Sequence, residues 1–267
     1  VATAGMTMAF ILAAIAAFKL LRNRHSEDRT YHKKALKMTM IVGFLSTILS
    51  MVAGDLSAKF LHKVQPEKLA AYEWHYDTQS HANLVFFGVL NEKTHEVSGA
   101  IEIPGLLSFL ADDSFKTKVK GLNDFPKNDL PPMIVHYFFD LMVSMGVFCF
   151  IISGLYMLIL FFKKLRKYKT NKAMLYAILL TGPASLLAIE FGWFLTEMGR
   201  QPWIIRGYMR VSQAATQAGG ITLVTILFGI LYLVLMVTAA YVLIRMYRNK
   251  PAYQDVDKVI EERGGTK

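Results

Sequence analysis

Residues 141–162 read LMVSMGVFCFIISGLYMLILFF, which is a run of 22 residues without a charged side chain. About 20 apolar residues are enough for one helix to cross the hydrocarbon core of a bilayer, where lipid offers the backbone no hydrogen-bond partner. The run therefore predicts a transmembrane helix. The composition of the whole 267-residue chain agrees, since 54% of its residues are hydrophobic and 19% are charged.

Four other apolar runs have a similar character. We expect five spans in all, at residues 1–18, 38–54, 131–162, 173–197 and within 211–244. The dipeptide Gly182-Pro183 is expected to break the fourth span, because proline removes a helical hydrogen bond. The last run is longer than one crossing, so its first residues should form a loop or a helix outside the membrane core. The predicted fold is an all-α, polytopic transmembrane helical bundle.

The distribution of charge predicts the orientation. The chain has 30 Lys and Arg against 20 Asp and Glu, and 19 of the 30 lie after the first span, after the third span and in the C-terminal segment. By the positive-inside rule these parts are cytoplasmic. Residues 55–131, with 11 acidic and eight basic residues, are then extracytoplasmic. The basic residues serve as topology signals, so no nucleic-acid partner is expected.

The chain accordingly divides into four parts. Residues 1–54 hold two spans with a basic cytoplasmic loop, 55–131 form the extracytoplasmic loop, 132–247 hold three spans, and 248–267 form a cytoplasmic tail. Because Val1 already lies inside an apolar run, we expect further residues before it.

Several kinds of chemistry have no support in the sequence. The chain contains no Walker motif, no GxGxxG, no HExxH and no internal repeat, so nucleotide-driven and zinc chemistry are not indicated. Its single cysteine, Cys149, excludes a disulfide framework or a CxxC metal site within the chain.

Ionisable groups stand out at the end of the fourth span. At about 100° per residue, Glu190, Trp193, Phe194 and Glu197 share one helix face. A charge inside a span costs several kcal/mol, roughly 2.5–3.5 at the centre, unless it has a partner or a function. Two interpretations stay open for Glu197: an interfacial residue paired with Arg200, or a carboxylate ligand or proton carrier that faces a cavity.

The third span carries Asp140, Met142 and Met145 behind His136 at its mouth. Methionine in an apolar helix is usually packing material, and His136 is expected to be a satisfied interfacial histidine. None of the seven histidines lies in the middle of a span. A haem with two histidine ligands within this chain is therefore excluded, and any haem here must use Met, Glu or a histidine from elsewhere.

The extracytoplasmic segment begins with an expected amphipathic helix over residues 64–74, with Pro66 in its first turn. Lys68 and Glu73 would lie about 140° apart around this helix and flank a site without pairing, although a solvated helix with ordinary charges is the alternative. Residues 84–103 alternate in a way that predicts short strands or loop, and 112–132 form a polar connector.

Five motifs occur together in a recognisable order. They are Gly54-Asp55, Lys68-Leu69-Ala70-Ala71-x-Glu73 with Thr78-Gln79, Phe139-Asp140-Leu141-Met142-Val143, Glu190-x-Gly192-Trp193-x-x-x-Glu197, and Gly199-Arg200-Gln201-Pro202-Trp203. This pattern resembles subunit I of cytochrome bd-type quinol oxidases over essentially the whole chain. The resemblance implies that the five spans are the C-terminal five of nine helices. It also implies that 55–131 is a quinol-binding loop of the short, mostly Gram-positive type.

The resemblance also implies roles for particular residues. Met142 would be the thioether ligand of a low-spin haem b, whose histidine partner would belong to a helix before Val1. Asp140 stands where some members of the family have Arg near that haem. The other implied site residues are Glu197 as axial ligand of a high-spin haem, Trp193 packed against the haem pair, Arg200 beside the haem propionates, and Lys68 and Glu73 in quinol binding and oxidation.

The implied protein is a terminal respiratory oxidase of the bacterial inner membrane, that is, a quinol:oxygen oxidoreductase. It would couple oxidation of menaquinol or ubiquinol to four-electron reduction of oxygen to water. Charge would be separated across the membrane without a proton pump. The implied cofactors are a low-spin haem b, a high-spin haem b, and a haem d or a further haem b. The implied partners are subunit II and a small single-helix subunit.

Two other classes of protein remain as alternatives. A transporter would use the broken helix at Gly182-Pro183 and buried acids as a midplane substrate site, but Glu197 and Arg200 lie at the end of the span and not at its centre. A membrane cytochrome b would pass electrons without reducing oxygen.

Overall fold

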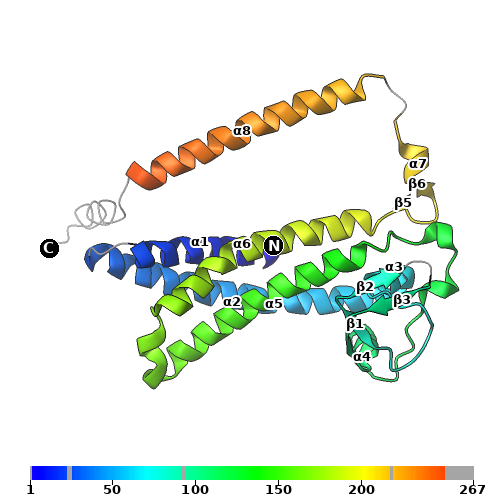
Figure 1. The fold of residues 1–267 in the computed structure, drawn as a ribbon, viewed down its shortest axis with the longest axis horizontal. Coiled ribbons are helices and arrows are strands. Elements are labelled where there is room, and N and C mark those ends of the chain that lie inside the picture. Colours follow the sequence, from blue (N-terminus) through cyan, green and yellow to red (C-terminus); the bar gives the residue numbers. More distant parts are fainter. Residues whose placement is uncertain (1, 23–25, 92–93, 217–218, 250–267) are drawn as a thin grey trace.

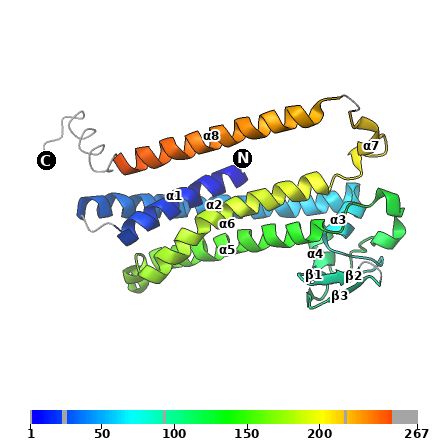
Figure 2. The same ribbon diagram turned by 45° about the horizontal axis from the view of Figure 1, so that its top comes forward.

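Four long helices form a bundle in the computed structural model, which describes residues 2–22, 26–91, 94–216 and 219–249. They are α1 (Ala2–Arg22), α2 (Ser26–Val64), α5 (Val135–Phe161) and α6 (Lys172–Met198), and they lie side by side in Figures 1 and 2. With α8 (Ile221–Asn249) they are the five helices of the described chain that are long and apolar enough to cross a membrane. The predicted all-α transmembrane fold with five spans is confirmed.

Helices α1 and α6 approach each other closely at Gly182. A Cβ atom added at Gly182 would lie 2.8 Å from the Cβ of Ala14, so the missing side chain is what allows the two backbones to approach. The expected break at Pro183 is wrong, because α6 continues through this residue. Proline removes one backbone hydrogen bond, and a helix that packs against both α1 and α5 tolerates that loss.

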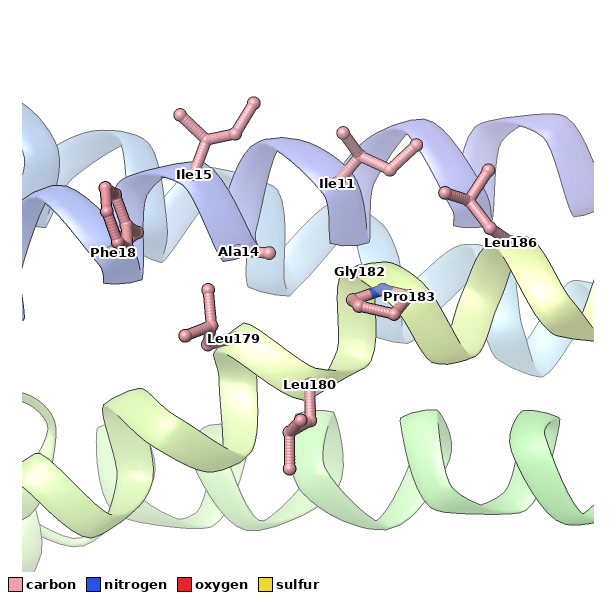
Figure 3. A pocket seen from close by; sticks show the side chains of 9 residues that line it. All are labelled: Ile11, Ala14, Ile15, Phe18, Leu179, Leu180, Gly182, Pro183 and Leu186. Carbon is pink, nitrogen blue, oxygen red and sulfur yellow. The ribbon is translucent and has the colours of Figure 1, made fainter.

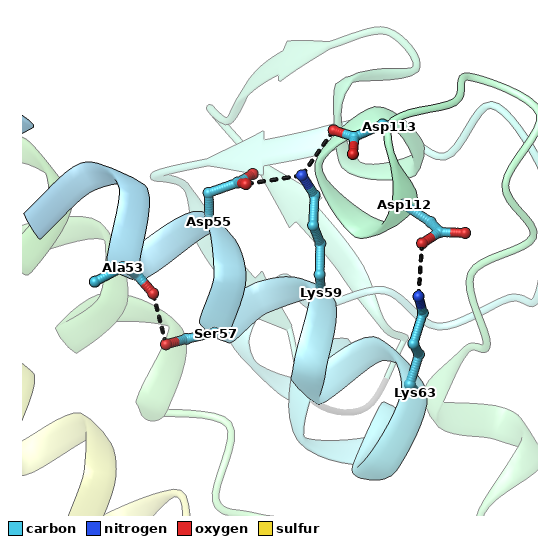
Figure 4. Close-up of polar contacts among 7 residues, drawn as sticks. All are labelled: Ala53, Asp55, Ser57, Lys59, Lys63, Asp112 and Asp113. Atoms are coloured by element: carbon cyan, nitrogen blue, oxygen red, sulfur yellow. Dashed lines mark hydrogen bonds and ion pairs between the residues drawn. The ribbon is translucent and has the colours of Figure 1, made fainter. Parts of the chain in front are cut away.

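Helix α2 is longer than the predicted span. Its 39 residues give a length of about 58 Å at 1.5 Å per residue, well beyond a hydrocarbon core of about 30 Å. The predicted boundary between residues 54 and 55 therefore falls inside a continuous helix. Figure 4 shows what holds the extension: the Lys59 ammonium lies 2.7 Å from both Asp55 and Asp113, and Lys63 pairs with Asp112 at 3.0 Å.

The segment between α2 and α5, residues 65–134, is here called the long loop. Helix α3 (Pro66–Tyr72) is followed by β1 (Leu84–Phe86), β2 (Val89–Asn91), β3 (Glu96–Ser98), β4 (Ile101–Ile103) and α4 (Leu106–Asp112). Strand β1 pairs antiparallel with β4, and β2 with β3, which confirms the short strands predicted between 84 and 103. Two short 3-10 helices, η1 (Leu122–Asp124) and η2 (Lys127–Asp129), lie in the polar connector.

The last part of the chain leaves the bundle. A 3-10 helix, η3 (Lys163–Tyr168), joins α5 to α6, and α6 leads into the pair β5 (Trp203–Ile205) and β6 (Met209–Arg210), then α7 (Val211–Ala214). Helix α7 agrees with the expectation that the first residues of 211–244 lie outside the span. Helix α8 lies apart from the bundle in both views, and all its side chains whose burial is described are exposed (Figures 1 and 2). Of the predicted tail 248–267, residues 250–267 lie outside the described residues.

Candidate functional site

The stripe predicted on the fourth span is present and uncovered. Glu190, Trp193, Phe194 and Glu197 are all exposed on α6. Trp193 has 57% of its surface exposed and Phe194 40%, and their ring centroids are 5.5 Å apart. This face offers a wide aromatic surface next to a carboxylate. A large planar apolar group with a metal at its centre, such as a haem, fits a face of this kind.

Arg200 lies near Glu197, as one of the two interpretations predicted. Its Nη2 atom is 3.6 Å from Glu197 Oε1, and both side chains are about half exposed. Charge-assisted hydrogen bonds are usually 2.7–2.9 Å long, so this is a loose, solvent-screened pair worth at most about 1 kcal/mol. The pair leaves the Glu197 carboxylate able to accept a further ligand.

Met142 lies where α5 faces α6. A Cβ atom added at Gly192 of α6 would come within 3.0 Å of the Met142 sulfur, so the absence of a side chain at 192 leaves room for the thioether. The side chain is partly buried against an apolar cluster formed with α3 and α6, whose members include Tyr72, Val135 and Leu195. A soft sulfur donor in apolar surroundings fits an axial haem ligand.

Lys68 lies on α3 near the same end of the bundle. It is half-buried, and its ammonium lies 5.8 Å from the centroid of the Tyr72 ring. Burial lowers the pKa of Lys68, and the charge of Arg200 acts in the same direction, while Glu67 and Glu197 oppose the shift. The charges of Glu197 and Arg200, at the end of α6, therefore act on the Lys68 ammonium.

Glu73 is buried at the end of α3. Helix α3 ends at Tyr72, and Glu73 is its C-cap residue, whose backbone N–H still bonds to the carbonyl oxygen of Leu69 at 3.2 Å. The 140° relation to Lys68 stays a prediction. The turn that follows, with Trp74 at φ +46°, directs the chain inward, and Glu73 is only 3% exposed. Burial raises the pKa of Glu73 well above its ordinary value, and the charge of Asp140 acts in the same direction.

His136 lies in the first turn of α5, and its side chain is completely buried by the rest of the protein. Its Nδ1 atom lies 2.6 Å from the carbonyl oxygen of Tyr72, which can only accept, so Nδ1 carries the proton and donates it. Its Nε2 atom lies 3.2 Å from Asp140 Oδ2. Sequence reasoning missed this pair, although four-residue spacing on one helix is a signal that could have found it.

The segment after α6 is attached to the long loop. Arg206 donates to Glu67 Oε2 at 2.7 Å and to the carbonyl oxygen of Val64, and Arg210 pairs with Asp129. The Tyr72 hydroxyl donates to the carbonyl oxygen of Leu195 at 3.3 Å. These contacts bring α3 against the end of α6, as Figures 1 and 2 also show.

The predicted site residues thus fall at one end of the bundle. Lys68 and Glu73 come from the long loop, Met142 from α5, and Trp193 and Glu197 from the last turns of α6. Such an arrangement defines a polytopic helical membrane protein with soft and acidic donors at one end and buried ionisable groups beside them. No ion pair between Lys68 and Glu73 occurs among the described residues.

Comparison with known proteins gives the family. Residues 1–251 match the family model described as cytochrome bd terminal oxidase subunit I, and the chain belongs to this family.

Two relatives come from Bacillus subtilis (strain 168). The chain is 39% identical over 259 residues to "Putative cytochrome bd menaquinol oxidase subunit I", covering 96% of this chain and 58% of that protein. It is 30% identical over 256 residues to "Cytochrome bd ubiquinol oxidase subunit 1", covering 90% and 53%. A solved structure titled "The structure of bd oxidase from Geobacillus thermodenitrificans" is similar with a TM-score of 0.84 and 46% identity, over 94% of this chain and 56% of that one. The chain spans a little over half the length of these proteins.

Proposed function

We propose that this chain is part of subunit I of a respiratory quinol oxidase, which oxidises quinol and reduces oxygen to water by four electrons. The observation that carries the proposal is that a thioether, an uncovered carboxylate and a loop with a buried acid meet at one end of the bundle in a member of the bd oxidase family. The quinol is menaquinol or ubiquinol, since relatives are named for each.

Four residues of α5 and of the end of α6 would hold the haems. Bound haem supplies one-electron transfer and, where a coordination position is open, oxygen binding. Met142 would donate its sulfur to a low-spin haem b, because a soft thioether favours reduced iron. Glu197 would ligate a high-spin haem b, with the exposed ring of Trp193 packed on the haem pair. Arg200 would lie beside the propionates, and the remaining haem is a haem d or a further haem b.

The long loop would bind the quinol. Lys68 and Glu73 are both displaced from ordinary solvation by burial, as their pKa shifts indicate. A carboxyl group whose pKa is raised is suited to take a proton from a quinol hydroxyl near neutral pH. Lys68 would orient the headgroup through its three N–H donors.

The distribution of basic residues supports one orientation of the chain in the membrane. The basic short loops and C-terminal segment would be cytoplasmic, and the long loop extracytoplasmic. Protons from quinol would then be released outside, while protons for water would come from inside. Charge is thereby separated in the cell membrane without a pump. Subunit II and a small single-helix subunit would complete the complex.

The groove between α1 and α6 argues against the transporter alternative. It has a volume of about 470 Å³ and lies at Gly182-Pro183, where a transporter would have its midplane substrate site (Figure 3). All nine lining residues are apolar, so the groove offers a polar substrate no side-chain partner. The other alternative, a cytochrome b without oxygen chemistry, is separated from the oxidase by whether a high-spin haem binds carbon monoxide.

The proposal is tested by Met142→Leu in the purified, complete oxidase complex. Loss of the sulfur donor should abolish the low-spin haem b absorbance and reduce quinol oxidation more than tenfold. Gly192→Ala, which places a methyl group 3.0 Å from that sulfur, should shift the same absorbance band. Met145→Leu is the matched control, because Met145 is also partly buried on α5, and it should behave like the wild type. An unchanged low-spin spectrum in Met142→Leu would remove the assignment.

A further inference from the structure

We propose that Asp140 and His136 of α5 form an anchor that holds the long loop against the helix carrying Met142, and that Asp140 acts as a positioning residue for quinol oxidation. The inference rests on the proposed function, because the segment being positioned contains Glu73. It assigns a role to two residues for which composition and spacing indicated none.

The first contact of the anchor is made by Asp140. Its Oδ2 atom accepts a hydrogen bond of 2.6 Å from the backbone N–H of Phe87, which is 53 residues away in the chain. Strand β1 ends at Phe86, and Phe87 takes φ +56°, so its N–H lies outside the β1–β4 pair and is available to α5. The hydrogen bond is short, and Asp140 is only 1% exposed, so water does not compete for it.

The second contact is made by His136. Its Nδ1–H donates to the carbonyl oxygen of Tyr72, and its ring lies 3.9 Å from the Trp74 indole in a stacked arrangement. The indole N–H of Trp74 in turn donates to the carbonyl oxygen of Met133 at 2.8 Å. The residues on both sides of Glu73 are therefore fixed to the start of α5.

Together the two contacts fix the loop at two separate points. One is the turn at 72–74, which places Glu73, and the other is Phe87 at the end of β1. His136 and Asp140 lie one helical turn apart on α5, with Nε2 3.2 Å from Oδ2, and no hydrogen bond of this nitrogen occurs among the described residues. Because Met142 follows Asp140 by two residues, the same helix sets the position of the loop and of the thioether.

A positioning role makes a specific demand on residue 140. Phe87 needs an oxygen acceptor at that place, and the amide of asparagine supplies one with the same shape. Leucine fills a similar volume and supplies none. If Asp140 served instead as a proton carrier, asparagine would fail as completely as leucine.

The test compares Asp140→Asn and Asp140→Leu in the complete oxidase complex, with Glu96→Gln on the exposed strand β3 as a control for loss of a loop carboxylate. Two quantities are measured: amide hydrogen exchange of a peptide containing Phe87, and the KM and kcat for quinol. Asp140→Leu should raise exchange and quinol KM at least tenfold, with kcat for an artificial one-electron donor and the low-spin haem spectrum retained. Asp140→Asn should stay within about threefold of the wild type in exchange and KM.

Two results would overturn the anchor. One is unchanged exchange and KM in Asp140→Leu. The other is an Asn variant whose Phe87 amide stays protected but whose quinol oxidation is as poor as that of the Leu variant. If Asp140→Leu does not assemble, His136→Phe keeps the stacking on Trp74 but removes the Nδ1–H donor. It should then raise exchange at 72–74 and quinol KM at least fivefold, and wild-type values would refute the anchor.

Failure of the proposed function looks different. A wild-type complex that binds no haem or oxidises no quinol would refute that function. The exchange comparison between the Leu and Asn variants would still decide whether Asp140 holds the loop.

Discussion

Glu73 is the residue whose environment differs most from that expected of an ordinary loop carboxylate. It is almost completely buried, and its Oε2 atom has no hydrogen-bond partner among the described residues. The charged form is therefore penalised, first by burial and then by Asp140. A buried carboxyl oxygen without a hydrogen-bond partner is costly to a fold, so this side chain is expected to lower the stability of the protein.

The raised pKa of Glu73 predicts how stability depends on pH. Below about pH 4.3, the ordinary pKa of Glu, both folded and unfolded states hold the proton; as pH rises toward the raised folded pKa, the unfolded state loses the proton first and stability falls. Gln at this position carries no charge and avoids the loss. The thermal unfolding midpoint of Glu73→Gln, measured relative to that of the wild type, should therefore be higher at pH 8.5 than at pH 5.5.

Quinol oxidation gives the second measurement on the same variant. Glu73→Gln should bind the wild-type amount of haem but oxidise quinol at least tenfold more slowly. Glu102→Gln, at an exposed acid of β4, is the control and should change neither quantity. In the unfolding experiment, a wild type that becomes more stable relative to Glu73→Gln as pH rises would contradict the raised pKa of Glu73.

At the scale of elements, the contact that assembles the site is that of α3 against the end of α6. A Cβ atom added at Gly199 would lie 2.5 Å from the Tyr72 hydroxyl oxygen and 2.6 Å from the carbonyl oxygen of Leu195. The Leu195 carbonyl belongs to α6 itself, so the contact with α3 is the one to the Tyr72 ring, which would have to move if residue 199 carried a methyl group. Gly199 therefore matters because it has no side chain. Its backbone angles are ordinary helical ones.

Gly199→Ala should separate α3 from α6. Overpacking of this kind typically costs about 1–3 kcal/mol, and the unfolding midpoint of the complex should fall accordingly. Gly54→Ala on α2 is the matched control, because nothing lies within 4 Å of a Cβ atom added there. Equal midpoints for the two variants would show that α3 does not pack against α6 in the way described.

At the scale of the whole molecule, the segment after α6 closes over the long loop and joins parts of the chain that are far apart in sequence. Arg206 and Glu67 are 139 residues apart and form an ion pair of 2.7 Å, with Glu67 largely buried and Arg206 45% exposed. Arg210 and Asp129 form a second link. These links hold the loop that carries Lys68 at the end of α6 that carries Glu197.

A double-mutant cycle on Arg206→Ala and Glu67→Ala measures this link. Because the pair is only half-buried, we expect a coupling free energy of about 0.5–1.5 kcal/mol in thermal or denaturant unfolding. The exposed pair Lys63 and Asp112 is the control and should couple by less than about 0.5 kcal/mol. Additive effects of the Arg206 and Glu67 changes would mean that the contact does not hold the two segments together.

The number and order of the spans could be predicted from the sequence because crossing a bilayer depends on a local property, the length of an uncharged apolar run. The stripe of Glu190, Trp193 and Glu197 was predictable for a similar reason, since helical periodicity alone places residues on one face. The length of α2 was not, because its extension is held by a contact of Lys59 with Asp113, which directly follows α4 and is distant in sequence.

The surroundings of Glu73, His136 and Asp140 were decided by tertiary structure alone. Local pattern left Glu73 either flanking a site or on a solvated helix, and it placed His136 at an interface. The folded chain buries both side chains, and the contacts of His136 and Asp140 join residues 53 to 64 positions apart. Burial and partner choice depend on which segments meet when the loop packs on the bundle, and no run of neighbouring residues encodes that. The sequence by itself thus determined the transmembrane helices and the candidate donors, and the packing of the long loop on α5 and α6 decided how those donors are brought together.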